Sequence, residues 1–394
     1  MTRRRIPAVL MRGGTSKGLF VRLEDLPSDL AVRDRVLLRA FGSPDPYGRQ
    51  MDGVGGGHSS ASKVAVISRS TRPGCDIDYL FGQVAVDRAL IDWSGSCGNL
   101  LSAAASFAID EGFVDVPSEG LATVRIWQVN LGQQIVARVP VQAGQTAETG
   151  SFEMDGVAFA GAEILIEYPP QDNADGGLFP TGRVLDRVEV PGIGRFDVTL
   201  VQAGMATAIV EARVLGLAGT ELPEHINGDD ELLERLEMIR AACAVAMGLA
   251  KTPQEATQTR PHMPKLAFVS PSIDYRASNG QVIGASSIDL VARIISMGKL
   301  HHAITGTGAA AIAAALQVPG TVPYRLAQTR SPKVRLGHAS GILTVEADVS
   351  QTAGTFTADR LAMSRSARRL MEGWVCTPGE FWPQDESDLA AIAR

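Results

Sequence analysis

The chain has 394 residues, of which 45% are hydrophobic and 20% charged, and its formal net charge is −6. This composition is typical of a globular protein, and the length favours two domains. The acidic balance, with no basic run longer than residues 3–5, argues against a nucleic-acid partner, and no stretch approaches the roughly 18 apolar residues of a transmembrane helix.

The cysteines and the first residues indicate in which cellular compartment the protein is expected. Cys75, Cys97, Cys243 and Cys376 lie far apart and form no CxxC pair, so we expect neither a zinc site nor a disulfide framework, and a reducing cytoplasm fits. The apolar run at residues 6–11 is too short for the core of a signal peptide.

The first half of the chain reads mainly as strands. We predict strands at residues 6–11, 19–21, 64–67, 76–81, 83–86, 124–129, 134–139 and 163–167. Leu and Val at helical spacing predict a helix over residues 25–39. Glycine-rich loops at residues 12–18 and 53–63 can bring backbone N–H groups close to an anion, although a plain hairpin turn also explains the first loop.

The second half of the chain is predicted to begin near residue 185, because residues 169–180 have the composition of a linker. Strands are predicted at residues 196–201, 208–212 and 265–269, with two more within 334–349. Helices are predicted at residues 229–251 (after an Asp cap), 288–297 and 359–372, and residues 301–316 show a glycine-rich start followed by alanines.

Cys97 lies where a turn of small residues runs into an Ala-rich segment with high helix propensity. The free N–H groups and positive dipole end of a helix start can hold a carboxylate and make a thiol easier to ionise. A single cysteine beside an apolar helix is more often a packing residue. Because the flanking glycines, serines and asparagine are turn and cap residues, we favour an exposed helix start with a reactive Cys97.

Three blocks recur in the same order in both halves of the chain. Residues 9–15, 62–67 and 94–100 resemble residues 200–205, 264–269 and 305–310, and alanines follow the last block of each set. A duplication explains this order, although glycine followed by alanine is also a common composition. If the halves face each other, two helix N-termini converge on one cleft and fit a ligand with carboxylates at opposite ends.

Short motifs spread over nearly the whole chain point to one family. They are RGGTSKG at residues 12–18, MDGVGG at 51–56, SKVA at 62–65, DYLFGQV at 78–84, WSGSCGNL at 93–100, SMGK at 296–299, RLGHASG at 335–341 and RRLMEG at 368–373. Together they resemble the PrpF family of 2-methylaconitate cis-trans isomerases, which is related in fold to diaminopimelate epimerase.

The resemblance implies an α+β fold of the diaminopimelate epimerase type. Two pseudo-symmetric domains, residues 1–185 and 186–394, would each wrap a mixed β-sheet around a central helix, and the second helix would start at residues 305–308. The resemblance also implies a cofactor-independent isomerase of unsaturated tricarboxylates, 2-methylaconitate or aconitate, as in the methylcitrate cycle of propionate catabolism. The family's catalytic lysine falls on Lys63 and its catalytic cysteine on Cys97.

The expected chemistry is an allylic proton shift handled by Lys63 and Cys97. Racemases of the wider group use two opposed cysteines, and the second helix start here has none. Lys63 would act as a neutral amine base whose pKa is lowered by burial, and Cys97 would protonate the other allylic carbon. The reverse assignment fits the sequence equally well, and the plain alternative for Lys63 is a solvated loop lysine.

Small polar residues and glycines of the loops are candidates to bind the substrate carboxylates. They are Thr15, Ser16, Ser60, Ser62, Gly98, Asn99, Gly306, Thr307 and Gly308, and the repeat adds Lys265. We interpret His301, His302 and His338 as structural or loop residues, because no carboxylate lies at metal-ligand spacing from them. We therefore expect neither a metal nor a cofactor.

Two alternative functions are consistent with the same residues. One is a 4-oxalomesaconate tautomerase. The other is a non-catalytic accessory protein of an aconitase-like enzyme, which would explain a carboxylate-binding cleft without requiring Cys97. The expected partner is a small-molecule tricarboxylate, with a homodimer and a functional pairing with an aconitase-like dehydratase as further candidates, and we expect no nucleic acid or membrane.

Overall fold

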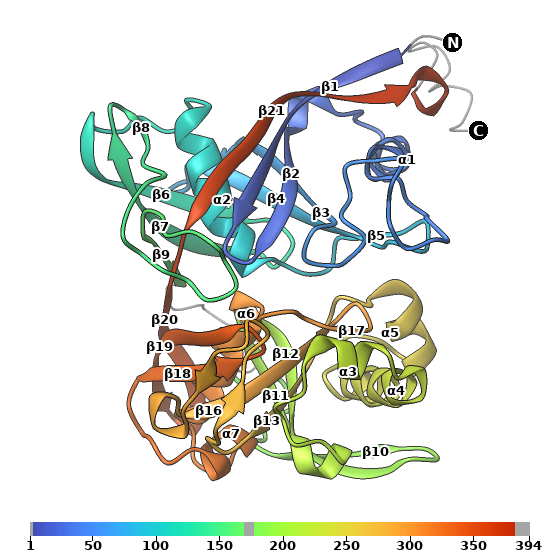
Figure 1. The fold of residues 1–394 in the computed structure, drawn as a ribbon, viewed down its shortest axis with the longest axis vertical. Coiled ribbons are helices and arrows are strands. Elements are labelled where there is room, and N and C mark those ends of the chain that lie inside the picture. The colour runs from blue at the N-terminus through green and yellow to red at the C-terminus, as the bar shows by residue number, and fades with distance from the viewer. Residues whose placement is uncertain (1–2, 169–176, 383–394) are drawn as a thin grey trace.

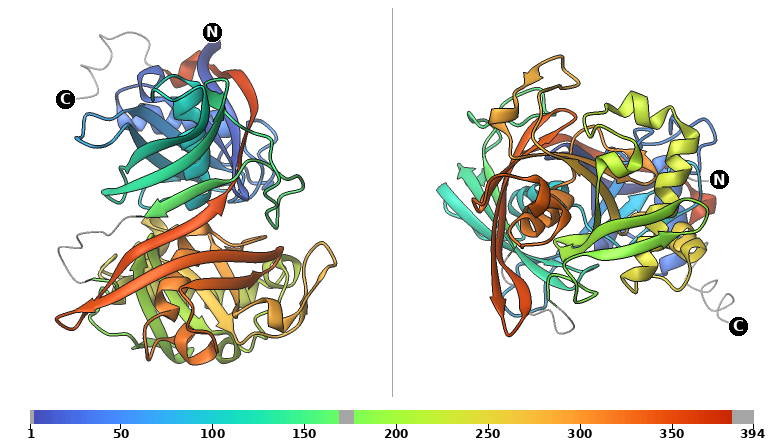
Figure 2. Two further views of the ribbon diagram at one scale, coloured as in Figure 1. Left: turned by 90° about the vertical axis from the view of Figure 1, so that its left-hand side faces the viewer. Right: turned by 90° about the horizontal axis from the view of Figure 1, so that it is seen from below.

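A computed structural model describes residues 3–168 and 177–382. These residues form two lobes that are joined by long strands (Figures 1 and 2). The strands of the N-terminal lobe are β1 (Arg3–Gly13), β2 (Ser16–Arg22), β3 (Lys63–Arg69), β4 (Ile77–Val84), β5 (Ile91–Asp92), β6 (Glu119–Gln128), β7 (Gln133–Gln142), β8 (Gln145–Thr146) and β9 (Ile164–Tyr168). The C-terminal lobe contains β10 (Asp186–Val190), β11 (Gly194–Ala203), β12 (Met205–Glu211), β13 (Lys265–Ser270), β14 (Tyr275–Arg276), β15 (Val282–Ile283), β16 (Leu290–Ser296), β17 (Lys299–Leu300), β18 (Lys333–His338) and β19 (Gly341–Thr352).

Two further strands connect the lobes. β20 (Thr355–Arg365) pairs with β19 in the C-terminal lobe and with β9 in the N-terminal lobe, and β21 (Ala367–Pro378) pairs with β1. All strands except β14 and β15 therefore belong to one large mixed sheet, in which β2–β3, β4–β6, β12–β13 and β16–β18 are the parallel pairs. β21 belongs to residues 186–394 by sequence, yet its partner lies in the other lobe, and the division near residue 185 stays a prediction.

The helices are few in the described residues. They are α1 (Leu30–Phe41), α2 (Gly98–Asp110), α3 (Pro223–Asn227), α4 (Asp230–Ala246), α5 (Pro253–Thr259), α6 (Gly306–Leu316) and α7 (Val322–Leu326). None of them combines the length and the hydropathy that a membrane-spanning helix requires.

Two Ala-rich helices form the centres of the lobes. α2 packs against strands of the N-terminal lobe and against β21, and α6 packs against β11, β12, β19 and β20. Almost every residue of both helices is buried, because small side chains let strands approach closely from several sides. The two helix N-termini meet: a Cβ atom on Gly98 would lie 3.0 Å from the backbone nitrogen of Thr307. The helices predicted after Cys97 and within residues 301–316 are thus confirmed.

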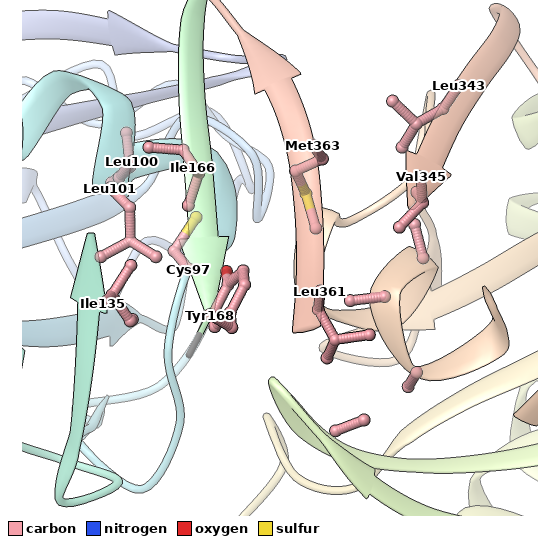
Figure 3. Packing of buried hydrophobic residues seen from close by; sticks show 14 of the residues in the cluster. Cys97, Leu100, Leu101, Ile135, Ile166, Tyr168, Leu343, Val345, Leu361 and Met363 are labelled. Atoms are coloured by element: carbon pink, nitrogen blue, oxygen red, sulfur yellow. The ribbon is translucent and has the colours of Figure 1, made fainter. Parts of the chain in front are cut away.

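The apolar packing around α2 leads to a stability prediction. Leu101 is completely buried and belongs to one apolar cluster with Ile135 and Ile166 (Figure 3). We expect Leu101→Ala to lower the free energy of unfolding by about 2–5 kcal/mol, because the truncated side chain leaves a cavity. Urea denaturation would measure this loss. The control Leu370→Ala, at a side chain that is 43% exposed, should change stability by less than about 0.5 kcal/mol.

Two predicted helices are wrong. Residues 288–297 contain β16, whose seven residues are all buried between β13 and β18, and an apolar run of this kind does not distinguish a buried strand from a helix. Residues 359–372 lie in β20 and β21. Their Arg, Leu and Met content favours a helix locally, but pairing with β9 and β1 overrides that preference.

Other boundaries shift by a few residues. α1 begins at Leu30, because the Asp29 side chain caps it by accepting a hydrogen bond from the backbone nitrogen of Val32. α4 has the predicted Asp229 cap but ends at Ala246. Residues 76–81 and 83–86 contribute to a single strand, β4. Much of the predicted linker, residues 169–176, lies outside the described residues.

Candidate active site

Lys63 is the first residue of β3, and its ammonium group is buried in the N-terminal lobe. The residue is only 4% exposed. Its Nζ donates a hydrogen bond of 2.5 Å to Oε1 of Gln83, the residue opposite it on β4, and lies 5.4 Å from the centre of the Phe81 ring. Burial lowers the pKa of Lys63, and the nearby Cys97 partly offsets this shift. Lys63 is therefore not a solvated loop lysine.

Cys97 is the N-cap residue of α2, and the β1–β2 hairpin turn packs against it. Its Sγ lies 3.9 Å from Oγ of Ser16, and Asn99 Nδ2 donates to Oγ1 of Thr15 at 3.0 Å. A Cβ atom on Gly13 would lie 2.6 Å from the carbonyl oxygen of Asn99, so a glycine is needed for the turn to approach the helix this closely. The glycine-rich turn is thus a hairpin, and it also brings the hydroxyl groups of Thr15 and Ser16 to the start of α2.

The N-termini of α2 and α6 lack side-chain caps. Neither the side chain of Cys97 nor that of Thr305, the N-cap of α6, accepts a hydrogen bond from its own helix. The Thr305 hydroxyl is buried without a hydrogen-bond partner among the described residues. Backbone N–H groups at such starts are free to bind an anion, and the aligned peptide dipoles favour negative charge there.

Lys265 occupies the first position of β13 and is also buried. Its Nζ lies 2.8 Å from Nδ1 of His262 and donates to Oγ of Ser296 at 2.7 Å. Because the amine donates to Nδ1, the His262 ring carries its proton on Nε2, which lies 3.2 Å from the carbonyl oxygen of Ser96 in the other lobe. Burial and the neighbouring Lys63 both lower the pKa of Lys265 well below its usual value.

Arg365 ends β20 at the junction of the two central helices. It is 1% exposed, its Nε donates to Oδ1 of Asn99 at 2.9 Å, and a Cβ atom on Gly306 would lie 3.0 Å from its second terminal nitrogen. Burial lowers the pKa of Arg365 to about 10. Tyr168 lies beside Cys97 (Figure 3), and its hydroxyl group is buried without a hydrogen-bond partner among the described residues.

Three buried basic side chains lie around the two helix N-termini. Every hydrogen-bond partner that Lys63, Lys265 and Arg365 have among the described residues is neutral. Buried charges are normally paired, so the Arg365 guanidinium offers positive charge that a bound anion would neutralise, and the two amines, whose pKa values burial lowers, can exchange a proton.

A cavity of about 820 Å³ lies between the lobes, and its lining includes Ser296, the hydrogen-bond partner of Lys265, but not Lys63, Cys97 or Arg365. The N-terminal lobe contributes His58 and Ser60 to its wall, and the C-terminal lobe contributes Ser296, His301 and His302. Ser60 Oγ lies 2.7 Å from Nδ1 of His58 and 3.3 Å from Nδ1 of His302, so it bridges the lobes. Ser296 accepts the hydrogen bond of Lys265 and therefore links this amine to the cavity wall.

The structure places the sequence-predicted residues in two groups. Thr15, Ser16, Asn99, Gly98 and Thr307 lie with Cys97 at the helix N-termini, and Lys63 and Lys265 flank this point. Two residues face elsewhere.

The first of these is Ser62, whose hydroxyl donates to Oε1 of Gln50 within a loop network. The second is Gly308, where a Cβ atom would lie 2.5 Å from Ile294, so this glycine serves close packing. Three further residues of this region, His262, Arg365 and Tyr168, were not predicted from the sequence. The one sequence signal connected with them is the WSGSCGNL motif, because it contains Ser96, which His262 contacts.

The buried histidines of this region imply acid sensitivity. Burial lowers the pKa of His302 to about 4 and that of His338 to about 3. An unfolded histidine ionises near pH ~6.5, so below that pH the unfolded chain binds more protons, and stability falls as the pH drops towards about 4. We expect urea midpoints to be lower at pH 5 than at pH 7, and His338→Asn to reduce this difference. An identical pH dependence in the variant would contradict the assignment.

Comparison with known proteins places these residues in a family. Residues 3–378 match the family described as PrpF protein. The 2-methyl-aconitate isomerase of Shewanella oneidensis is 49% identical over 387 residues, which is 95% of this chain and 97% of that protein. The crystal structure of methylitaconate-delta-isomerase is 37% identical, with a TM-score of 0.74, and the match covers 98% of this chain and 99% of that one.

A more distant structure shares the fold alone. The probable proline racemase of Agrobacterium radiobacter K84 is 13% identical, with a TM-score of 0.56, and covers 95% of this chain and 94% of its own. The mixed α/β architecture is therefore that of the racemase and epimerase class. Because the family match and the relative at 49% identity both span nearly the whole sequence, this chain belongs to the PrpF family.

Proposed function

We propose that this protein is a cofactor-independent isomerase that shifts an allylic proton on an unsaturated tricarboxylate, 2-methylaconitate or aconitate. The observation that carries this proposal is the cluster of three buried basic side chains, Lys63, Lys265 and Arg365, with neutral partners beside two helix N-termini that have no side-chain cap. A polyanionic substrate would neutralise that charge. The name of the Shewanella oneidensis relative supports the choice of acid.

Lys63 and Cys97 are the proposed proton carriers. The neutral Lys63 amine takes a proton from the carbon next to one carboxylate, and the C–H electron pair spreads through the double bond onto the conjugated carboxylate. The Cys97 thiol then donates its proton to the other end of the allylic unit. A proton passes from the Lys63 ammonium to the thiolate before the next turnover. The lowered pKa of Lys63 favours the neutral amine that this direction requires.

The charge that develops on the carboxylates needs donors already in position. We assign this role to the first N–H groups of α2 and α6, to the Arg365 guanidinium and to the Tyr168 hydroxyl. Thr15, Ser16 and Asn99 complete this end of the site, and Lys265 faces it from the C-terminal lobe. Fixed donors of this kind usually supply the largest part of the rate enhancement, because they need no reorganisation during the reaction.

The proposal includes a duplicated architecture. Lys63 and Lys265 each open a strand, and Gly98 and Gly306 each open a buried helix. These correspondences support two pseudo-symmetric halves divided near residue 185, which contribute one helix N-terminus each. A homodimer and a functional pairing with an aconitase-like dehydratase remain part of the proposal, and both are open to test by light scattering and co-purification.

A substrate panel tests the proposed function. The purified protein is incubated in D₂O with cis-aconitate, trans-aconitate, 2-methylaconitate and 4-oxalomesaconate, and each acid is followed by proton NMR. We expect solvent deuterium to enter 2-methylaconitate or an aconitate, and thiol alkylation to stop the exchange. Turnover of 4-oxalomesaconate alone would favour the tautomerase, and exchange in none of the acids would favour the accessory-protein alternative.

A further inference from the structure

His301 has a hydrogen-bond donor that nothing in the described residues uses. Its Nδ1 accepts a hydrogen bond from the backbone nitrogen of Ala303 at 3.0 Å. The neutral ring must therefore carry its proton on Nε2. That Nε2 is buried and has no hydrogen-bond partner among the described residues. Buried donors are rarely left unpaired, because an unmade hydrogen bond is costly.

The surroundings keep His301 neutral. Its ring stacks on that of His302 with 4.7 Å between centroids, and the nearby basic groups of Lys63, Lys265 and His338 disfavour a positive charge on His301. Burial and these neighbours lower the pKa of His301 well below its usual value. The ring is thus a fixed, uncharged donor.

A second donor lies on the same wall. His301 and Ser296 both line the cavity of about 820 Å³ between the lobes. Ser296 Oγ accepts the hydrogen bond of Lys265, which leaves the hydroxyl hydrogen of Ser296 free to donate. Two donors on one cavity wall that have no acceptor among the described residues, with an amine behind one of them, are the groups that would bind an anionic oxygen pair.

We propose that His301 and Ser296 form a separate carboxylate subsite on the cavity wall, which selects a tricarboxylate over a dicarboxylate. The inference rests on the proposed function. In this arrangement the helix N-termini and Arg365 hold the carboxylates next to the reacting carbons, and the arm that ends in the remaining carboxylate extends past Lys265 towards Ser296 and His301. A dicarboxylate with the same double bond has no group to satisfy the two donors, so its binding does not depend on them.

Two substitutions at His301 separate its donor from its packing. In His301→Asn the side-chain oxygen can still accept the hydrogen bond from Ala303, but the Nε2 donor is lost. In His301→Gln an amide N–H can reach the position of Nε2. His338 provides the matched control: it is buried, its Nδ1 likewise accepts a backbone N–H, from Ser340, and it does not line the cavity.

The test compares kcat/KM for 2-methylaconitate with that for 2,3-dimethylmaleate, in which a methyl group replaces the third carboxylate arm. We expect His301→Asn to reduce the tricarboxylate-to-dicarboxylate ratio about tenfold and His301→Gln to keep it within about threefold of wild type. His338→Asn should leave the ratio unchanged. An equal loss on both acids in His301→Asn, or an unchanged ratio, would overturn the proposal.

A binding measurement keeps this inference separate from the proposed function. Calorimetry with tricarballylate and 2-methylsuccinate, two saturated acids, makes the same comparison without catalysis. Weaker binding of tricarballylate alone in His301→Asn supports the subsite, even if wild type isomerises neither unsaturated acid, a result that would refute the proposed function. Equal binding of tricarballylate by wild type and His301→Asn refutes the subsite, whatever the activity.

Discussion

Replacing Cys97 by alanine is expected to lower kcat for 2-methylaconitate isomerisation by about 10³-fold or more, at the upper end of what one acid–base group contributes. Cys97 caps α2, and its sulfur lies 3.9 Å from Ser16 Oγ at the point where the two helix N-termini meet. The other thiols lie elsewhere: Cys243 is buried within α4, Cys75 contacts Gln134, and Cys376 pairs with Arg5 near the outer end of β1. Lys63→Met should cause a loss of the same order, because it removes the other proton carrier.

The measurement combines steady-state kinetics with deuterium incorporation. The matched control is Cys243→Ala, which removes a buried thiol outside the site and should change kcat by less than about twofold. Iodoacetamide should inactivate wild type and the Cys243→Ala variant, with protection by saturating substrate. If Cys97→Ala and Lys63→Met each kept kcat near the wild-type value, the assignment of the proton carriers would be wrong.

Replacing Arg365 by methionine is expected to reduce kcat/KM by about 10²–10³-fold, mainly through a higher KM, because it removes a buried charge that has only neutral protein partners. Arg365→Lys should recover part of the loss, since an ammonium group keeps the charge but not the forked geometry. Both variants lose the Arg365 Nε hydrogen bond to Asn99. The difference in KM between Arg365→Met and Arg365→Lys therefore reports the effect of the positive charge on substrate binding.

A second buried arginine serves as the control for Arg365. Arg293 is also fully buried, its pKa is likewise lowered to about 10 by burial, and its Nε donates to the carbonyl oxygen of Glu221 in the C-terminal lobe. Arg293→Met should lower the urea midpoint without a specific rise in KM. If both variants lost only stability and retained the wild-type KM, Arg365 would be a structural residue and the carboxylate assignment would fail.

Local sequence was sufficient to predict the secondary structure around the two proposed proton carriers. Lys63 opens a strand and Cys97 precedes a helix, as the small-residue loops before them predict. The exposed helix start expected at Cys97 is wrong, because the second helix N-terminus and the β1–β2 turn cover it and leave Cys97 8% exposed. The glycine-rich turn before Thr15 was predicted as a possible anion loop or a hairpin, and it is a hairpin that packs on α2. Such features depend on backbone freedom and helix propensity within a few residues, and a sequence window contains that information.

Tertiary structure alone decided the rest of the site. His262 reaches Ser96, and Arg365 reaches Asn99, across large separations in the chain. Arg365 can do so only because residues 355–365 form a strand that pairs with both lobes, where local composition favours a helix. A residue's own neighbours determine its intrinsic preference, but pairing between distant strands and the docking of the lobes determine which side chains meet. For that reason the sequence by itself determined the family and the local backbone settings of the proposed proton carriers, and the packing of the two lobes determined which buried basic side chains surround them.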